Sequence, residues 1–143
     1  MVVYAIPLMG DLNRRFPSRV SPAYDGAVFK PIKACEEISR ETREIEFEYV
    51  VLDRIVSHGE VLAEIDSRGF RPVLPEELIS FAEKYPDEQW KYPIVALGSE
   101  ASVNGGYRVA CLWRDGNRRC LDLPWIGGRW RIGCRFLVVR KAA

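Results

Sequence analysis

The sequence has few of the side chains from which metal centres are built. His58 is the only histidine, and the four cysteines, Cys35, Cys111, Cys120 and Cys134, form no C-x-x-C pair. Zinc sites usually combine such ligands at short spacings, and calcium sites need clustered oxygen ligands, which the C-terminal stretch does not offer. We therefore expect no metal and no cofactor. The thiols should be free, with a Cys111–Cys120 disulfide across a hairpin as the alternative.

Long apolar runs and targeting signals are also missing. No stretch approaches the roughly 18 apolar residues of a membrane-spanning helix. The opening MVVYAIPLMGDLNRRF lacks the basic start, apolar run and cleavage site of a signal peptide. We expect a cytoplasmic protein without a membrane partner. At 143 residues, the chain can bury a core as one domain, residues 1–143.

Lysine, glutamate, glutamine and methionine are absent from Ala101–Arg140, although the first hundred residues hold twenty of them. At that frequency forty residues would hold about eight. Arginine, aspartate, asparagine, glycine, cysteine, isoleucine and leucine take their place. A solvent-facing hairpin and loop has no physical reason to prefer Arg to Lys and Asp to Glu so completely, so a constraint other than folding is indicated.

Charge is distributed unevenly along the chain. The net charge is +1, but residues 103–143 carry nine basic and two acidic side chains, and the rest carries twelve basic and eighteen acidic. The basic end is also rich in tryptophan. This distribution is typical of a face that binds anions or nucleic acid, and it is equally compatible with arginines on a solvated surface.

The hydrophobic pattern predicts an α+β fold, with two helices on one side of a mainly antiparallel, twisted sheet. Residues 1–33 should form an edge strand at Val2–Leu8 and an ordered loop, and residues 101–141 a hairpin, a long loop and a final strand. The expected strands are Glu44–Leu52, Pro93–Gly98, Tyr107–Arg114, Asn117–Leu123 and Arg135–Arg140. The expected helices are His58–Ser67 and Pro75–Lys84.

Local motifs carry most of these assignments. Residues 44–49 alternate strictly, which indicates a half-buried strand. Ser57 and Glu60 have capping-box spacing, which explains His58 as a first-turn residue rather than a catalytic one. Residues 136–139 are apolar at every position, as expected of a strand inside a sheet. Asp115-Gly116 predicts the turn of the C-terminal hairpin.

Four segments resemble a known group of proteins: Gly69–Pro72, Pro75–Leu78, Pro93–Ser99 and Cys134–Lys141. Over roughly residues 23–141 the chain is similar to short bacterial proteins that look like the variable proteins of diversity-generating retroelements. The C-terminal part of those proteins has a C-type-lectin-like fold related to the formylglycine-generating enzymes. The resemblance implies a binding scaffold whose C-terminal codons are rewritten at adenines, often in AAC, while the fold is kept.

Changes at the adenines of AAC can never encode Lys, Glu, Gln, Met or Trp. That restriction accounts for the residues missing from Ala101–Arg140. Trp113 departs from it, because AAC cannot produce tryptophan, so this residue is either fixed or encoded by another codon. The resemblance implies a scaffold of Leu112, Leu121, Leu123, Trp125, Trp130, Phe136, Leu137 and Val139, in which we expect both Trp125 and Trp130 to be buried.

The resulting candidate ligand-binding residues lie on the hairpin and the loop after it: Trp113, Arg114, Asp115, Asn117, Arg118, Cys120, Ile126, Gly127, Gly128, Arg129, Arg131, Ile132 and Gly133. Cys134 is a further candidate variable position. The leading hypothesis is a non-enzymatic binding protein for an unknown protein or other macromolecule, because arginine and tryptophan dominate binding hot spots and isoleucine adds apolar area. One alternative is nucleic-acid binding through the same Arg and Trp residues. The other is an enzyme related to the formylglycine-generating group.

Overall fold

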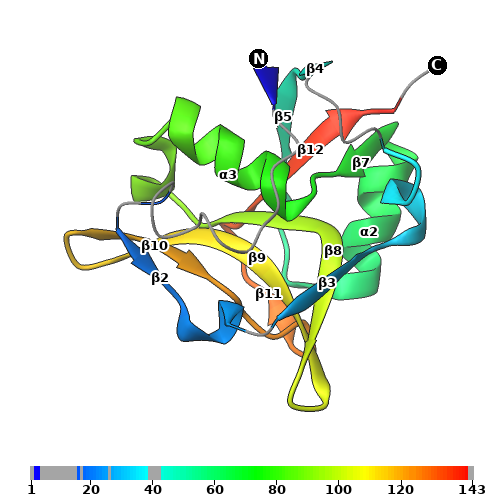
Figure 1. The fold of residues 1–143 in the computed structure, drawn as a ribbon. Helices are drawn as coiled ribbons and strands as arrows, with labels where there is room; N and C mark the ends of the chain where they lie inside the picture. Colours follow the sequence, from blue (N-terminus) through cyan, green and yellow to red (C-terminus); the bar gives the residue numbers. More distant parts are fainter. Residues whose placement is uncertain (1, 4–15, 17, 26, 39–42, 142–143) are drawn as a thin grey trace.

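The computed structural model describes residues 2–3, 16, 18–25, 27–38 and 43–141 (Figure 1). Short strands and 3-10 turns precede residue 58: β1 (Val2–Val3), β2 (Arg19–Val20), η1 (Pro22–Tyr24), β3 (Val28–Pro31), η2 (Lys33–Cys35), β4 (Arg43–Glu44), β5 (Phe47–Val50) and β6 (Val56–Ser57). The rest is α2 (His58–Ser67), β7 (Phe70–Pro72), α3 (Pro75–Lys84), η3 (Glu88–Trp90), β8 (Ile94–Val103), β9 (Gly106–Asp115), β10 (Arg118–Asp122), β11 (Arg129–Trp130) and β12 (Arg135–Arg140).

Eight strands form one mixed sheet, which confirms the α+β class. Its main path runs β2-β10-β9-β8-β12-β5, with β3 added to β8 and β7 to β12. The β10–β2 and β12–β8 pairs are parallel, and the other pairs are antiparallel. Strand β12 lies between β5 and β8, so the apolar run at residues 136–139 is an interior strand as predicted.

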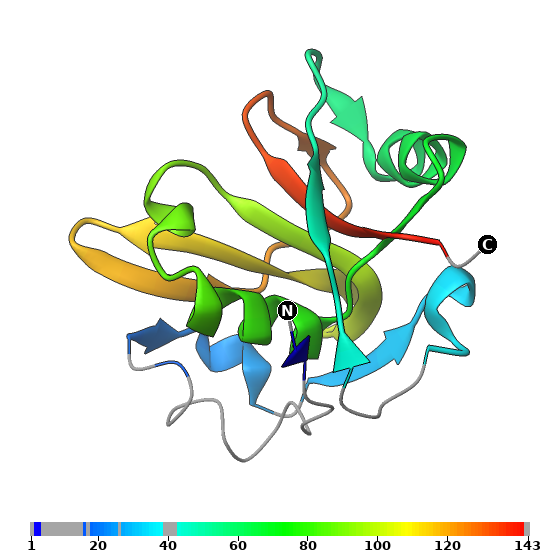
Figure 2. The same ribbon diagram turned by 90° about the horizontal axis from the view of Figure 1, so that it is seen from above.

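The two helices cover opposite faces of this sheet, and the prediction that they share one side is wrong (Figure 2). Leu78 of α3 packs in a core with Ala96, whereas Ile65 of α2 packs in a second core with Val95. Neighbouring residues of a strand point to opposite faces. A strand that is apolar at every position must therefore be covered twice. None of the described helices is long and apolar enough to cross a membrane.

The hairpin of β8 and β9 is longer than predicted. We expected β8 to end at Gly98 and a polar loop to follow, but β8 continues to Val103, which pairs with Gly106. Asn104 and Gly105 form the turn, with φ of 48° and 82°. Type I′ hairpin turns need positive φ at both central residues, and Asn-Gly is their commonest sequence.

The second hairpin turns one residue later than predicted. Asp115 is still paired, opposite Arg118, so the turn is Gly116–Asn117. Gly116 has φ of 60°, as a type II′ turn requires at its first central position. The predicted strands on either side are confirmed within one or two residues, as are β12 and both helices.

Two predictions before residue 58 are corrected. The ordered loop predicted within residues 1–33 contains strands, because β2 pairs with β10 and β3 with β8. The strand predicted at Glu44–Leu52 is divided into β4 and β5 by residues 45–46. Of the edge strand predicted at Val2–Leu8, only β1 lies within the described residues, and it pairs with β4.

Side-chain caps fix both helix starts. Ser57 accepts from the backbone N–H of Glu60 at 3.2 Å while Glu60 accepts from that of Ser57 at 3.1 Å, which is the predicted capping box. At α3 the Glu77 carboxylate accepts from the backbone N–H of Leu74 at 2.7 Å. The same carboxylate receives two hydrogen bonds from Arg71, at 2.8 and 2.9 Å, which joins β7 to α3.

Gly98 of β8 lies directly against the segment between β7 and α3. Its N–H donates to the Val73 carbonyl at 2.7 Å, and its own carbonyl accepts from Ile32 N–H at 3.0 Å. A Cβ at this position would lie 2.3 Å from the Val73 carbonyl oxygen, which is backbone and cannot rotate away. Only glycine fits without displacing β8.

We expect Gly98→Ala to lower the free energy of unfolding by about 1–3 kcal/mol, because the new methyl group must push two backbone segments apart. Gly127→Ala is the matched control, since a Cβ there meets nothing within 4 Å, and its effect should stay within about 0.5 kcal/mol. Urea denaturation of both variants measures the difference. Equal stability of the two would contradict the close approach.

Candidate binding face

The tip of the β9–β10 hairpin carries four of the candidate residues, and all four are exposed: Arg114, Asp115, Asn117 and Arg118. The tip projects well beyond the helices (Figure 1). Asp115 pairs with Arg19 of β2 at 3.2 Å, with both side chains largely in solvent. Such a pair contributes little stability, so the tip is positioned mainly by its strand register.

The loop that follows β10 carries most of the others. Five of the candidate residues there are exposed: Gly127, Gly128, Arg129, Arg131 and Ile132. Strand β11 lies within this loop and pairs with β6, Arg129 opposite Ser57 and Trp130 opposite Val56. Ile126 is partly buried against the α2 core, and Gly133 has φ of 101°. The loop is therefore tied to the eight-stranded sheet at both ends, and at its middle to β6 in a separate two-stranded sheet.

A cavity of about 320 Å³ lies between these two regions. Four candidate residues line it: Trp113, Gly128, Arg129 and Arg131. Other lining residues come from strands β8 to β10, from the residue before β8 and from the loop that leads to β12: Pro93, Val95, Cys111, Asp122, Pro124, Trp125, Trp130 and Cys134. Ligand pockets usually start near this size and combine apolar walls with a few polar groups.

The electrostatics of the cavity are mixed. Burial raises the pKa of the Asp122 carboxyl, an effect that Arg19 partly offsets. The guanidinium of Arg114 lies 5.4 Å from the centre of the Trp113 ring. Arg129 lies near enough to help lower the pKa of Glu60, a shift caused first by the backbone hydrogen bond with Ser57. The cavity thus combines one partly desolvated acid, Asp122, with two arginines in its lining, Arg129 and Arg131.

Trp130 and Trp125 occupy different environments, and the prediction that both are buried is wrong for Trp125. Trp130 is partly buried and meets the Phe136 ring edge-on, with centroids 5.7 Å apart. Trp125 is 46% exposed. Its ring lies over Gly106, where a Cβ would come within 2.1 Å, and beneath Arg108, whose guanidinium is 3.8 Å from the ring centre.

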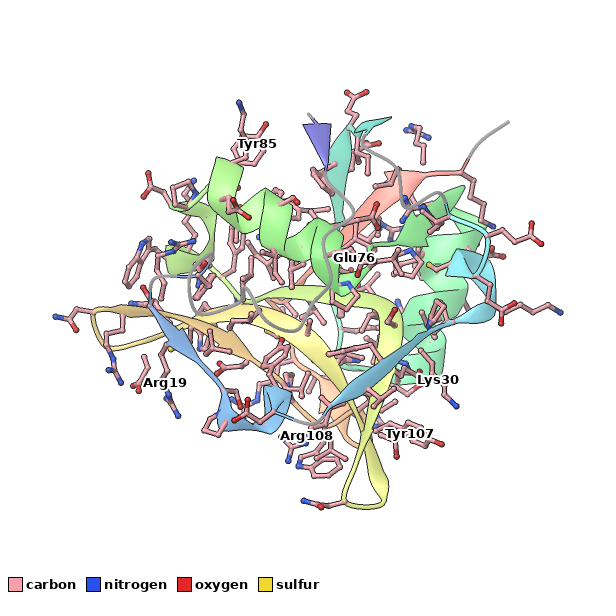
Figure 3. All side chains as sticks on the ribbon, viewed as in Figure 1. Arg19, Lys30, Glu76, Tyr85, Tyr107 and Arg108 are labelled. Atoms are coloured by element: carbon pink, nitrogen blue, oxygen red, sulfur yellow. The ribbon has the colours of Figure 1, made fainter. Side chains whose placement is uncertain are left out.

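The backbone explains why Trp125 turns outward. Residues 124–126 run beside β9, with Val109 N–H donating to Pro124 O and Ile126 N–H donating to Tyr107 O, both at 3.1 Å. In extended chain, side chains alternate between faces. Ile126 joins the α2 core, and Trp125 therefore points to the other side. Figure 3 shows Arg108 and the 55%-exposed Tyr107 on opposite sides of the β8–β9 hairpin.

Cys120 differs from the other candidate residues because it is only 1% exposed. It lies opposite Trp113, while Cys111 lies opposite Asp122, so the two cysteines do not face each other. All four cysteines are free thiols, which contradicts the disulfide alternative. Burial raises the pKa of Cys111 and of Cys134, which disfavours reactive thiolates. Within the described residues, no three His, Cys, Asp or Glu side chains are grouped to hold a metal.

Gln89 is a supporting residue that sequence patterns did not reveal. It is 1% exposed in η3. Its amide nitrogen donates to the carbonyls of Trp113 and Cys120, and its amide oxygen accepts from Arg119 Nε at 3.2 Å. A lone glutamine in a polar turn gives no sequence signal for such contacts. Gln89 holds the hairpin at the edge of the cavity.

In comparisons with protein-family models, with curated proteins and with solved structures, nothing matches this chain.

Proposed function

We propose that this chain is a non-enzymatic binding protein whose C-terminal hairpin and loop form a diversified ligand-binding face on a C-type-lectin-like scaffold. The binding face consists of the exposed tip of β9–β10, the exposed part of residues 126–133 and the cavity between them. Its ligand is a protein or another macromolecule. The proposal joins the coding restriction in Ala101–Arg140 to the placement of those residues in the fold.

One observation carries the proposal: within a single segment, most residues expected to vary are exposed and most residues expected to be fixed are buried, with Cys120 and Trp125 as the exceptions. Arg114, Arg118 and Arg129 are exposed, whereas Leu112 and Leu121 are at most 1% exposed. A surface can change sequence without loss of the fold only if its variable side chains make few core contacts. Cys120 is excluded from the binding face because it is buried.

The DNA around the gene tests this proposal directly. We expect an imperfect repeat of the codons for about residues 108–135, differing from the gene only at adenines, beside a reverse-transcriptase gene. The differences should fall on exposed positions such as Arg129 and Ile132, and spare buried ones such as Leu121. A repeat that differs equally at other bases, or no repeat at all, would exclude diversification as the origin of the binding face.

Nucleic-acid binding is the competing function, and the arginines of the binding face allow a sharp test. We expect the variant with Arg114, Arg118, Arg129 and Arg131 all replaced by serine to stay folded, because all four side chains are exposed. We also expect the unmodified protein to bind single-stranded DNA or RNA of mixed sequence only weakly at moderate salt. If the arginines served phosphates, affinity would instead fall by decades as salt rises, and the four-serine variant would lose it. Fluorescence anisotropy over a salt series separates the two outcomes.

A further inference from the structure

A second cavity lies between the edge strand β5 and helix α3, apart from the binding face. Its volume is about 640 Å³, and it shares no lining residue with the cavity of the binding face. Strand β5 ends the main path of the sheet, so one side of the cavity is open. Tyr85 projects from the outer end of α3, as Figure 3 shows.

Aromatic rings form much of the cavity wall. Phe47 and Tyr49 come from β5, and Phe81 and Tyr85 come from α3 and its end. The Phe81 ring lies 5.4 Å from Phe47, 6.0 Å from Tyr49 and 5.2 Å from Tyr85, measured between centroids. Tyr85 is 44% exposed, so the wall is accessible. These contacts hold the rings in place before a ligand arrives, and rings held in this way can bind cations through their faces.

The charged groups of the cavity all have one sign. Glu46, Glu48 and Glu88 line it, and the described lining contains no lysine, arginine or histidine. Glu88 accepts hydrogen bonds from the hydroxyls of Tyr49, at 2.9 Å, and Tyr92, at 3.2 Å. Its pKa is lowered, first by its hydrogen bond with Lys91.

Two of these acids have cationic neighbours outside the cavity. Glu88 pairs with Lys91 at 2.8 Å, and Glu48 pairs with Arg140 at 3.3 Å on the face of β5 opposite Phe47 and Tyr49. Glu46 is exposed, and no described lysine, arginine or histidine forms an ion pair with it. It is thus the one carboxylate of the three without an ion pair among the described residues, and it also borders a neighbouring hollow lined by Lys33, Arg71, Arg140 and Lys141.

We propose that this cavity binds an organic cation, an alkylammonium group such as a lysine side chain, methylated lysine or a free quaternary amine carries. Aromatic faces attract such cations by their quadrupole, most strongly where water is partly excluded. The carboxylates add a long-range electrostatic attraction for the same cation. An anionic or neutral ligand would gain neither the cation–π attraction nor the attraction to the carboxylates. The site is independent of the binding face, and its test does not depend on the function proposed for that face.

Chemical-shift titration of the isotope-labelled full chain tests the proposal. The probes are tetramethylammonium, acetylated lysine amide, acetylated trimethyl-lysine amide and the uncharged tert-butyl isostere of the last. We expect saturable shifts at Phe47, Tyr49 and Tyr85 with the cations, and binding of the neutral isostere weaker by about fivefold or more. Binding of tetramethylammonium identifies a free quaternary amine as sufficient. Binding of the lysine derivatives alone identifies a cation carried on a peptide.

Variants distinguish a specific cation site from nonspecific binding. Tyr85→Ala and Glu46→Gln should each weaken binding of trimethyl-lysine amide by about threefold to fivefold. Asp53→Asn, which removes an exposed acid outside the cavity, should leave binding unchanged, and all three variants should unfold at nearly the same urea concentration. The proposal would be overturned if the neutral isostere bound with equal affinity, if the shifts lay at the binding face, or if no cation gave a saturable shift. It would also be overturned if Tyr85→Ala and Glu46→Gln weakened binding no more than Asp53→Asn does.

Discussion

Phe136→Ala should lower the free energy of unfolding by about 3–5 kcal/mol, whereas Arg129→Ser and Ile132→Ser should each change it by no more than about 0.5 kcal/mol. Phe136 is 2% exposed in the interior strand β12, and its ring contacts Trp130. Removing it leaves a cavity in the core beneath α2. The loop residues Arg129 and Ile132 lie in solvent, Ile132 with 62% of its surface exposed.

Chemical denaturation of the three variants measures this contrast. The three substitutions lie within eight positions of one another in a chain of 143 residues, so a difference cannot come from general intolerance of this segment. Comparable losses in all three would mean that the loop is part of the core. The separation of a changeable surface from a fixed scaffold, on which the proposed function depends, would then fail.

Arg71→Met should also cost about 3–5 kcal/mol, because it removes the bidentate partner of a carboxylate buried between β7 and α3. The Glu77 side chain is 2% exposed and that of Arg71 is 11% exposed. Burying an ion is expensive unless it is paired and hydrogen-bonded. Leu74 N–H would remain bonded to Glu77, but a neutral donor replaces little of the lost charge pairing.

Two comparisons make the Arg71 measurement specific. Arg68→Met breaks a similar pair with Glu64, also at 2.8 Å, whose side chains are 41% and 33% exposed, and it should cost no more than about 0.5 kcal/mol. The double variant Arg71→Met with Glu77→Leu should regain part of the loss, because no uncompensated carboxylate remains. A double variant as unstable as the sum of its parts would show that shape, not charge, holds this junction.

Helices α2 and α3 could be predicted from sequence because their signals are local. The Ser57–Glu60 capping box, the proline at the start of α3 and the apolar spacing along each helix all act within a few residues of the chain. The interior position of β12 was also predictable, because only a strand covered on both faces can be apolar at every position. The Asn104–Gly105 turn had a clear sequence signal, but Gly98 was interpreted as the end of β8.

The tertiary structure alone decided how distant segments meet. Opposite placement of α2 and α3 depends on which strands separate them, and periodicity within a helix carries no such information. Trp125 is exposed because residues 124–126 pair with β9 in a register that local sequence does not specify. Gln89 contacts two strands more than twenty residues away. The cavity between β5 and α3 likewise joins residues 45–49 to residues 81–88.

The amino-acid sequence by itself determined the α+β class, the helix boundaries, the final interior strand and the restricted composition of Ala101–Arg140. Those properties follow from residue type and from neighbours within a turn or two of the chain. Only the packed fold decided how deeply each C-terminal side chain is buried. It also decided the cavity between hairpin and loop and the aromatic cavity beside β5. They depend on long-range pairing, in which a shift of one residue reverses the face that a side chain occupies.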